Sequence, residues 1–551
     1  MLLCAVCVTP FAVQAQSRAW ASGRSEVFAG SELERYLRVL QVEGLAGEYP
    51  WSLRAFSAGE LDRMGPRWSS HPWVGRYDLG ARRVRGLRLD LVAPTVSLWS
   101  NSAFPFGGND GPVWQGRGVT VAATAGVAIG WGPLSVTFAP QVFRAQNSDF
   151  ALLPVDTALG YPWADPRFPP ISEHARIDRP QRFGDAPYSR QDPGQSTARL
   201  DVLGISLGVS TANELWGPAD QYPLVLGNHA PGFPHLFLGT SRPRDLWLVR
   251  AHGRLVWGEL RRSPFAGPEY DPFIGYPVDT TRRFMSGLVL TVQPRGIAGL
   301  EVGLARFFHT PWPRTGLEWG DYLKPLSGLL KAGLPDEWIF LPGSHGDPDN
   351  QLASAFMRWV LPGSGFEVYG EYAREDHSWD LRDFLSEPEQ SSAFLVGARK
   401  TWARRDGSIW SLRGEVVDAQ QPGLIRGRGG YPFYVHLWVL AGHTERGQVL
   451  GSDAAALGGA GMSLKLERYT RRGRVSISYE SQLRASQAAY HWGGQVEPRG
   501  RDYQHAFGIE CLRFVGPFDV LLGVTGVREL NRDFRRDASN LHLTLGVRAR
   551  M

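Results

Sequence analysis

From about Val84 to the C-terminus, hydrophobic and polar residues alternate with a period of two along many short runs. In the run 474–483, for example, Val475, Ile477 and Tyr479 are separated by polar side chains. This period places successive side chains on opposite faces of a β-strand. We count about seventeen such runs, many of them about 9 to 11 residues long, which is the length that a tilted strand needs to cross a bilayer. The pattern predicts an all-β chain with membrane-crossing strands.

The predicted strands cover most of this region. They are expected near 86–93, 119–129, 134–144, 198–209, 246–257, 284–293, 299–308, 351–361, 365–374, 393–402, 409–418, 432–441, 462–469, 474–483, 505–514, 518–528 and 541–549. Because single-chain barrels usually have an even number of strands, we predict one large transmembrane antiparallel β-barrel of about 16–18 strands, with about 18 favoured. The many charges at the polar positions suit a water-filled or loop-plugged lumen. A soluble β-propeller is the alternative architecture, because the signal of each single strand is weak.

The first residues have the features of a secretory signal peptide. An apolar stretch fills residues 2–13, and a small-residue cleavage motif follows it, so residues 1–15 are assigned to the signal. Cys4 and Cys7 lie inside the apolar stretch, which leaves Cys511 as the single cysteine of the mature chain. We therefore predict an exported protein without an internal disulfide.

A different pattern precedes the alternating region. Apolar positions at helical spacing follow Ser31 and Glu34, which stand in capping-box spacing, and a second short helix is expected after Phe56. The chain is accordingly divided into a small periplasmic helical region, 16–80, and an outer-membrane β-barrel with long loops, 81–551.

Composition narrows the class of protein further. The net charge is only +5 and no basic run is present, which argues against a nucleic-acid partner. No segment has the 18 or more consecutive apolar residues of a transmembrane helix. An exported chain of this kind is periplasmic, secreted or an outer-membrane barrel, and the strand pattern favours the outer membrane of a Gram-negative-type cell.

Several segments together resemble the capsule assembly Wzi family of outer-membrane proteins. They are "GGNDGPVWQGRG" from Gly107, "LWGPADQYPLVLGNHAPGFPHLFLG" from Leu215, "PDNQLASAFMRWVLPGSGFEVYGEYAREDHSWDL" from Pro348 and "YVHLWVLAGHTERGQVLGSD" from Tyr434. "LERYLRVLQVEGL" followed by "WSLRAFS" is similar to the helical entry region of that family. The resemblance implies a monomeric barrel of about eighteen strands. It also implies periplasmic helices, a lectin-like role in attaching capsular polysaccharide, and no catalysis.

The loop around Trp114 carries the first candidate sugar-binding residues. Carbohydrate recognition needs flat aromatic faces and planar polar side chains that match pairs of hydroxyl groups. Such residues gather within this one loop: Asn109, Asp110, Trp114, Gln115 and Arg117. The competing interpretation is a structural turn in which Trp114 belongs to the aromatic girdle at the membrane interface.

The segment 215–239 carries the second set. Its prolines and glycines exclude a regular helix or a central strand, so we predict a rigid loop packed in or over the lumen. Trp216 and Asn228 are candidate sugar contacts, although such a loop can also serve simply as a plug. His229 and His235 do not stand in metal-ligand spacing and are expected to be hydrogen-bonded loop residues.

Other motifs are assigned structural roles. The acidic residues Glu371, Glu375, Asp376 and Asp380 are interpreted as a solvated acidic loop. Asp347 and Asp349 lack the EF-hand pattern and are interpreted as part of a turn.

The letters of a nucleophile elbow, "GISLG" at 204–208, place Ser206 within alternating residues, hence on a strand rather than a strand–turn–helix. We therefore predict no enzyme, no catalytic residue, no metal site and no cofactor.

Two functions remain after these exclusions. The first is a lectin-like outer-membrane protein that binds capsular polysaccharide or exopolysaccharide, with outer-membrane lipid and the polysaccharide export machinery as further partners. The alternative is a porin-like channel for sugars or other small solutes. The state of the lumen discriminates them, because inserts and opposed charges that close it favour the lectin.

Overall fold

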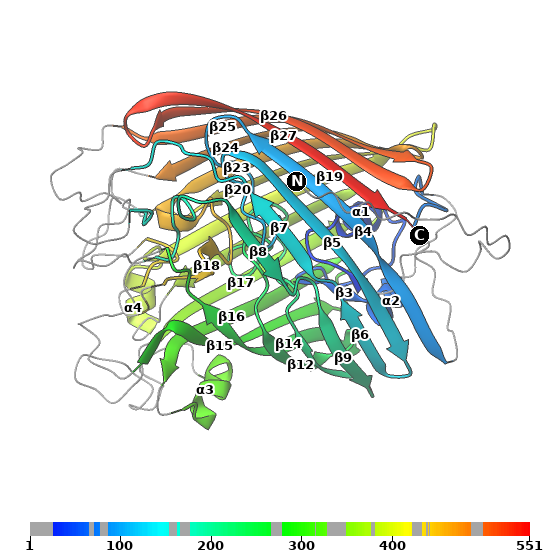
Figure 1. The fold of residues 1–551 in the computed structure, drawn as a ribbon. Helices are drawn as coiled ribbons and strands as arrows, with labels where there is room; N and C mark the ends of the chain where they lie inside the picture. The colour runs from blue at the N-terminus through cyan, green and yellow to red at the C-terminus, as the bar shows by residue number, and fades with distance from the viewer. Residues whose placement is uncertain are drawn as a thin grey trace.

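A closed antiparallel barrel is the main feature of the computed structural model (Figure 1). The structure describes residues 26–64, 71–77, 86–153, 162–165, 177–265, 278–313, 316–327, 349–375, 381–420, 432–436, 439, 441–485 and 500–550. Within these residues the barrel has 18 strands. In this count, two consecutive short segments that share one position in the wall are taken as one strand, which applies to β6 with β7, β8 with β9 and β12 with β13. The prediction of an antiparallel barrel with 18 strands is confirmed.

The barrel strands follow one another in chain order around the wall, and pairing of the last with the first closes it. Their bounds are β4 (Leu87–Asn101), β5 (Gly118–Trp131), β6 (Leu134–Phe138), β7 (Gln141–Ala145), β8 (Tyr188–Asp192), β9 (Thr197–Val202), β10 (Ile205–Ser210), β12 (His235–Thr240), β13 (Arg244–Asp245), β14 (Val249–Arg261), β15 (Val278–Pro294), β16 (Leu300–Pro313), β17 (Asn350–Leu361), β18 (Phe366–Glu375), β19 (Ser392–Ala403), β20 (Ile409–Asp418), β23 (Ala460–Thr470), β24 (Gly473–Ala485), β25 (Asp502–Val515), β26 (Phe518–Arg532) and β27 (Arg536–Ala549).

The period-two pattern separates an apolar outer face from a polar inner face. On β24, Val475 and Ile477 are exposed to the outside, whereas Ser476 is buried inside. Leu541 and Leu543 likewise face outward on β27 while His542 is buried. A barrel with an apolar exterior and a polar interior is the arrangement of a sheet that lies in a bilayer.

The two ends of the barrel differ in the length of their connections. Short turns such as Arg471–Arg472 and Gly516–Pro517 join strands at one end. At the other end the connections are long, including 146–187, 314–349 and 419–459. The short helices α3 (Trp319–Leu323) and α4 (Leu381–Ser386) belong to these long connections, at the left in Figure 1.

The N-terminal residues lie inside the barrel near the short-turn end. They form β1 (Glu26–Val27), α1 (Glu32–Val42), β2 (Leu53–Arg54), β3 (Phe56–Ser57) and α2 (Ala58–Met64). Both predicted helices are therefore present. Ser31 caps α1, since its side chain accepts a hydrogen bond from the backbone N–H of Glu34 at 3.3 Å.

Helix α1 is buried on nearly every side, which is unusual for so polar a helix. Its apolar residues pack against Ile409, Tyr469 and Leu512 of the barrel wall. Its charged residues meet counter-charges on the inner face: Arg38 contacts Glu367 at 3.0 Å, and Glu32 contacts Arg474 at 2.7 Å. A buried charge is tolerated only with such a partner, so these pairs fix the position of the helix in the lumen.

The rest of one side of the lumen is filled by a second hydrophobic cluster. It joins the loop 211–234, the segment 432–459 and inward-facing side chains of the wall such as Val256, Phe307 and Leu352. The short strand β11 (Leu215–Trp216) pairs with β2, which ties this loop to the N-terminal element. The predicted rigid loop in the lumen is therefore present.

Two of the predicted strands, 198–209 and 432–441, differ in the structure, and the observed strands β8 and β12 had no predicted counterpart. The run 198–209 is two strands, β9 and β10, because the chain reverses at Leu203 and Gly204, both with positive φ. The described part of 432–441 is not a strand but a buried lumen segment, since its apolar side chains pack in the lumen core. Strand β12 was missed because its sequence was assigned to the proline-rich loop.

Candidate functional site

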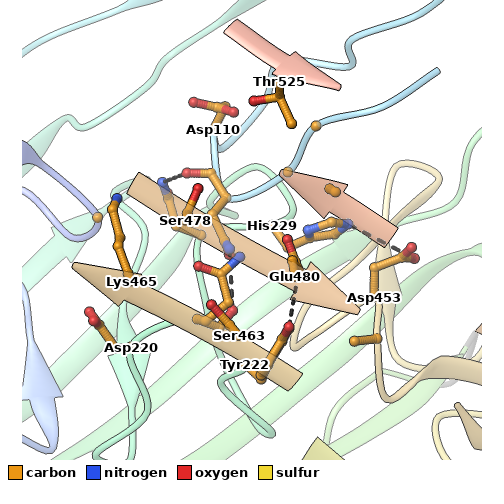
Figure 2. A pocket seen from close by; sticks show the side chains of 18 of the residues that line it. Asp110, Asp220, Tyr222, His229, Asp453, Ser463, Lys465, Ser478, Glu480 and Thr525 are labelled. Carbon is orange, nitrogen blue, oxygen red and sulfur yellow. Dashed lines mark hydrogen bonds and ion pairs between the residues drawn. The ribbon is translucent and has the colours of Figure 1, made fainter. Parts of the chain in front are cut away.

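A cavity of about 400 Å³ lies in the lumen beside the hydrophobic cluster that the loop 211–234 and the segment 432–459 form. Its wall is the polar inner face of β4 and β23 to β27, and its other sides are α1, the loop 102–117, the loop 211–234 and residues 452–454. All of these elements supply lining residues. Figure 2 labels side chains from β23, β24, β26, both loops and the segment 452–454. The cavity is therefore assembled from residues far apart in the sequence.

The strand wall carries hydroxyl, amide and charged groups in neighbouring positions. Ser463 and Lys465 of β23 are paired in register with Glu480 and Ser478 of β24, and Thr525 lies two strands further along. Figure 2 shows these side chains around the same space. Such a surface offers both donors and acceptors, which is what a ligand with many hydroxyl groups requires.

The loop 102–117 is held over the cavity by hydrogen bonds at both of its ends. Asn101 donates to the carbonyl groups of Phe106 and Gln115 at 2.9 and 3.0 Å. Gln115 in turn donates to the Asp110 carboxylate at 2.5 Å, while the Gln115 side-chain oxygen has no hydrogen-bond partner among the described residues. The loop thus presents an acidic group and a buried free acceptor beside the cavity.

The loop 211–234 is bonded directly to the first loop. Asn228 donates from its side chain to the carbonyl group of Asn109 at 2.7 Å, and its own carbonyl accepts from Gly111 at 2.8 Å. Asn109 donates back to the carbonyl group of Gln221 at 3.2 Å. The Asn228 side-chain oxygen has no hydrogen-bond partner among the described residues. Both loops therefore contribute an unused acceptor near one cavity.

Glu415 of β20 fixes the tip of the second loop. Its carboxylate accepts backbone hydrogen bonds from Asp220, Gln221 and Tyr222 at 2.8, 2.9 and 2.7 Å. The Tyr222 hydroxyl then donates at 2.8 Å to Glu480 of β24, two strands further along the wall. Several charge-assisted hydrogen bonds to one buried carboxylate make a rigid anchor, so this part of the cavity is pre-organised.

Charges in the cavity are mostly paired across its width. Burial disfavours the charged form of Asp220, but Arg413 and Arg399, at 3.0 and 2.7 Å, hold its pKa well below its usual range. Burial lowers the pKa of His229, which lies 3.9 Å from Asp453. The side chain of Arg35 of α1 lines the same cavity and has no hydrogen bond or ion pair with another described residue, whereas its backbone N–H donates to Ser31 at 3.2 Å.

Asp110 behaves differently from Asp220. Burial raises its pKa to about 6, and the opposing influence of Arg35 and of the hydrogen bond from Gln115 is weaker. Asp110 is therefore the cavity carboxyl whose charge changes in the range of ordinary environmental pH.

The structure separates the seven predicted sugar contacts into two groups. Asn109, Asp110, Gln115 and Asn228 all line the cavity. Arg117, Trp114 and Trp216 do not. Arg117 donates to the carbonyl groups of Ser102 and Asp149 and so ties loop ends together.

Neither predicted tryptophan presents a face to the cavity. Trp216 is 0% exposed in the lumen core and its indole donates to Glu214 at 2.8 Å, so it has no free face for a sugar. Trp114 packs against Phe183 and Tyr188, with ring centroids 5.0 and 6.4 Å away. It therefore belongs to an aromatic cluster with these two rings.

The other sequence motifs have clear places. Glu371 and Glu375 are buried inside the barrel, so their interpretation as a solvated loop is wrong; the pleat of β18 turns both side chains into the lumen. Asp349 contacts Lys324 at 3.1 Å, whereas Asp347, Asp376 and Asp380 lie outside the described residues. Ser206 lies on β10, as predicted.

His235 is hydrogen-bonded, as predicted, although it is the first residue of β12 rather than a loop residue. His235 contacts the carbonyl oxygen of Phe233 at 2.8 Å. The part of the chain that the structure describes holds no group of three or more potential metal ligands. Among the same residues, no helix is long and apolar enough to cross a membrane.

Sequence reasoning missed most of the cavity residues. Ser463, Lys465, Ser478 and Glu480 are polar members of alternating runs, and that alternation was the available signal. It indicates that a side chain faces the lumen, but not which lumen residues share one cavity. Phe106 was also missed; it is half-buried, lines the cavity and contacts His542 edge to face, with ring centroids 5.3 Å apart.

Comparison with known proteins places the fold. No family model matches the chain, and no curated protein matches it. The structure is similar to that of Wzi of Escherichia coli, an outer-membrane protein involved in group 1 capsule assembly and described as a carbohydrate-binding β-barrel. The two have a TM-score of 0.60 and 14% sequence identity, and the match covers 96% of this chain and 99% of Wzi. The two proteins thus share a barrel fold.

Weaker similarity extends to two barrels of Pseudomonas aeruginosa. OccK5 matches with a TM-score of 0.36 and 10% identity, over 84% of this chain and 98% of its own. The outer-membrane protein OprD matches with a TM-score of 0.35 and 10% identity, over 85% of this chain and 95% of its own.

Proposed function

We propose that this protein is an outer-membrane β-barrel of the Wzi type that binds capsular polysaccharide or exopolysaccharide and helps to attach or assemble it at the cell surface. The apolar exterior of the closed sheet supports the membrane location. The proposal includes no catalytic step.

The observation that carries the proposal is the filled lumen. A continuous hydrophobic cluster packs between the loop 211–234, the segment 432–459 and one side of the wall, and α1 with its ion pairs occupies the short-turn end. Fixed, close-packed interiors exclude water and solutes. A barrel built in this way is better suited to holding a ligand at a pre-formed cavity than to passing solutes through.

The chemistry of the cavity fits a hydroxyl-rich ligand. Asn109, Asp110 and Asn228 offer planar polar groups, and the free acceptors on Gln115 and Asn228 suit donation from sugar hydroxyls. Phe106 supplies the aromatic face that Trp114 and Trp216 do not. Because the cavity charges largely pair with one another, a neutral stretch of polysaccharide can be accommodated.

A binding experiment with matched variants tests this site. The purified protein in detergent is titrated with the polysaccharide of its own strain, using wild type, Phe106→Ala and Trp114→Ala. We expect Phe106→Ala to weaken binding about tenfold through loss of a stacking face. Trp114→Ala removes an aromatic ring from the same loop outside the cavity and is expected to leave the affinity within about twofold of wild type.

Equal losses in both variants would indicate that loop order, rather than the Phe106 ring, controls binding. Heat-modifiable migration on gels confirms that each variant keeps its barrel. Binding that no cavity variant changes would contradict the proposed site.

Two further measurements separate the lectin from the channel. In a strain that lacks the protein, we expect polysaccharide to be made but shed into the medium, and restoration of the gene to return it to the cells. In planar bilayers the purified protein is expected to show no sustained conductance. Normal attachment together with steady open-channel currents would favour the porin-like alternative.

A further inference from the structure

A second cleft lies at the long-loop end of the barrel, outside the lumen cavity. It has a volume of about 320 Å³ and is lined mainly by Phe104, Phe150, Leu152, Arg532, Arg535 and Arg536. We call it the rim cleft. The turn between β26 and β27 supplies its arginines, and two neighbouring loops supply its apolar wall. The turn lies at the left end of the barrel in Figure 1.

The arginines of the rim cleft are not equally engaged. Arg532 is paired with Glu529 and Asp533 and lies over the ring of Phe104, 4.2 Å from its centroid. Arg535 and Arg536 are exposed, and their side chains have no hydrogen bond or ion pair with any described residue. Among the described residues that line the cleft, Asp533 is the one carboxylate, and Arg532 pairs with it, so these residues together carry an excess of positive charge.

The turn that carries these arginines is held in a costly backbone conformation. Asn531, Asp533 and Phe534 have φ of 58°, 54° and 55°, in the left-handed region that non-glycine residues rarely adopt. Asp537 accepts from the N–H of Asn531 at 3.0 Å, and Asp502 accepts from that of Asp533 at 3.0 Å. A strained backbone conformation persists only where surrounding contacts hold it in place, and such conformations are often found at functional sites. The position of the arginines is therefore fixed by the turn.

We infer that the rim cleft binds an anionic sugar unit, with its carboxylate or phosphate held by Arg535 and Arg536. Two adjacent guanidinium groups are suited to bidentate recognition of such anions. The half-buried ring of Phe150 and side chain of Leu152 provide an apolar surface for the C–H face of the sugar, while buried Phe104, covered by Arg532, forms the base of the cleft. This inference goes beyond the proposed lumen site and uses none of its binding residues.

The position of the cleft favours a ligand that approaches the mouth of the barrel. Phe104 is buried with Ala506, Val527 and Ala538, which are on the inward face of the wall. The cleft therefore opens toward the barrel mouth rather than toward the lipid-facing side. The loop 102–117 lines both sites, since Ala103 and Phe104 border the rim cleft and residues 105–110 border the lumen cavity. One polymer chain is thus able to contact both.

The test compares two variants that each lose two positive charges. Arg535→Gln/Arg536→Gln removes the unpartnered guanidinium groups from the cleft. Arg471→Gln/Arg472→Gln removes two exposed arginines from a turn at the opposite end of the barrel. The ligands are oligogalacturonate and its methyl ester, which has the same backbone without the charges. Binding is measured by titration calorimetry in detergent.

We expect oligogalacturonate to bind wild type and Arg471→Gln/Arg472→Gln with equal affinity. Its affinity for Arg535→Gln/Arg536→Gln is expected to be at least about tenfold lower. The affinity for wild type is expected to fall as the salt concentration increases. The methyl ester is expected to show no binding that depends on Arg535 and Arg536. Equal affinity of the two double variants for oligogalacturonate, or equal binding of the ester and the acid, would contradict recognition of a carboxylated sugar by the rim cleft.

A parallel titration identifies the source of the anion. Deacylated lipopolysaccharide core carries phosphorylated sugars from the membrane surface, whereas oligogalacturonate represents a free acidic polysaccharide. Dependence of either titration on Arg535 and Arg536 supports the anion cleft and assigns its source, while independence of both contradicts it. A failure here leaves the lumen cavity untouched, because Phe106→Ala is assayed separately with the polysaccharide of the strain.

Discussion

At the scale of single residues, burial decides which charged side chains of this barrel are fixed and which can change state. Asp220 lies between two guanidinium groups and stays ionised, whereas Asp110 lacks so close a cation. Its pKa is therefore raised to about 6 by desolvation, although Arg35 opposes this and Glu510 adds to it. The same type of side chain thus has two different roles within one cavity.

The shift of Asp110 predicts a pH-dependent affinity. The pKa of Asp110 in the folded protein, about 6, lies above the usual value of 3.8. Folding therefore favours the neutral acid. The contribution of this group to the stability of the fold is complete below about pH 4 and is lost as the pH rises through 6. The carboxylate accepts sugar hydroxyl groups more strongly than the neutral acid. We expect binding of neutral polysaccharide to tighten roughly fivefold between pH 5 and pH 7.

The check is a series of titrations across that range with wild type, Asp110→Asn and Asp406→Asn. Asp110→Asn is expected to give a flat profile. Asp406 lies in a turn at the short-turn end, so Asp406→Asn should keep the wild-type profile. A flat wild-type profile, or an unchanged slope in Asp110→Asn, would remove Asp110 from the site.

At the scale of elements, the lumen loop 211–234 depends on close approaches that a glycine permits. Gly217 has φ of +88°, and a Cβ there would lie 2.5 Å from a side-chain oxygen of Glu371. Its backbone N–H donates to Ser52 at 2.9 Å, which joins the loop to the N-terminal element. The loop 211–234 therefore has a defined conformation at Gly217, because the neighbouring Glu371 and Ser52 constrain the backbone there.

Replacement of Gly217 should weaken the packing of the loop 211–234 in the lumen. We expect Gly217→Ala to reduce the free energy of unfolding by about 2 kcal/mol or more, from backbone strain and overpacking together. Gly132→Ala is the matched control, because Gly132 also has positive φ, +57°, but nothing lies within 4 Å of its Cβ position. The control is expected to lose about 1 kcal/mol or less.

Urea unfolding of the two variants in detergent, followed by tryptophan fluorescence, measures the difference. Equal stability of Gly217→Ala and Gly132→Ala would show that the lumen loop moves aside without cost.

At the scale of the whole molecule, the unequal ends of the barrel predict its orientation in the membrane. Outer-membrane barrels have short turns toward the periplasm and longer loops toward the outside. The lumen helix α1 lies near the short-turn end, where Glu43 and Glu48 accept backbone hydrogen bonds from Ala403 and Gly299 at 3.0 and 2.6 Å. The rim cleft would then face the medium.

Cysteine labelling on cells tests this orientation. In a Cys511→Ser background, a membrane-impermeant maleimide is expected to label Arg535→Cys on intact cells. Arg472→Cys, in a short turn, should react only after the outer membrane is permeabilised. The reverse pattern would place the long loops in the periplasm and would contradict both the orientation and the exposure of the rim cleft.

The sequence by itself determined the barrel, its apolar exterior and the two N-terminal helices, because these depend on local periodicity and capping that a single segment contains. The predicted number of strands agrees with the structure partly because errors cancel. The run 432–441 is not a strand, whereas 198–209 contains two strands that form a hairpin and β12 was missed. Four of the seven predicted contacts line the cavity because polar loop residues are a local signal.

Only the tertiary structure decided what fills the lumen. Trp216 and Trp114 look equally suited to a sugar in the sequence, yet packing buries the first completely and places the second in an aromatic cluster. The cavity wall and the rim cleft unite residues from distant strands, which strand register and barrel closure bring together. Such long-range juxtaposition has no periodic signature in a single sequence, and for this reason only the folded barrel could reveal it.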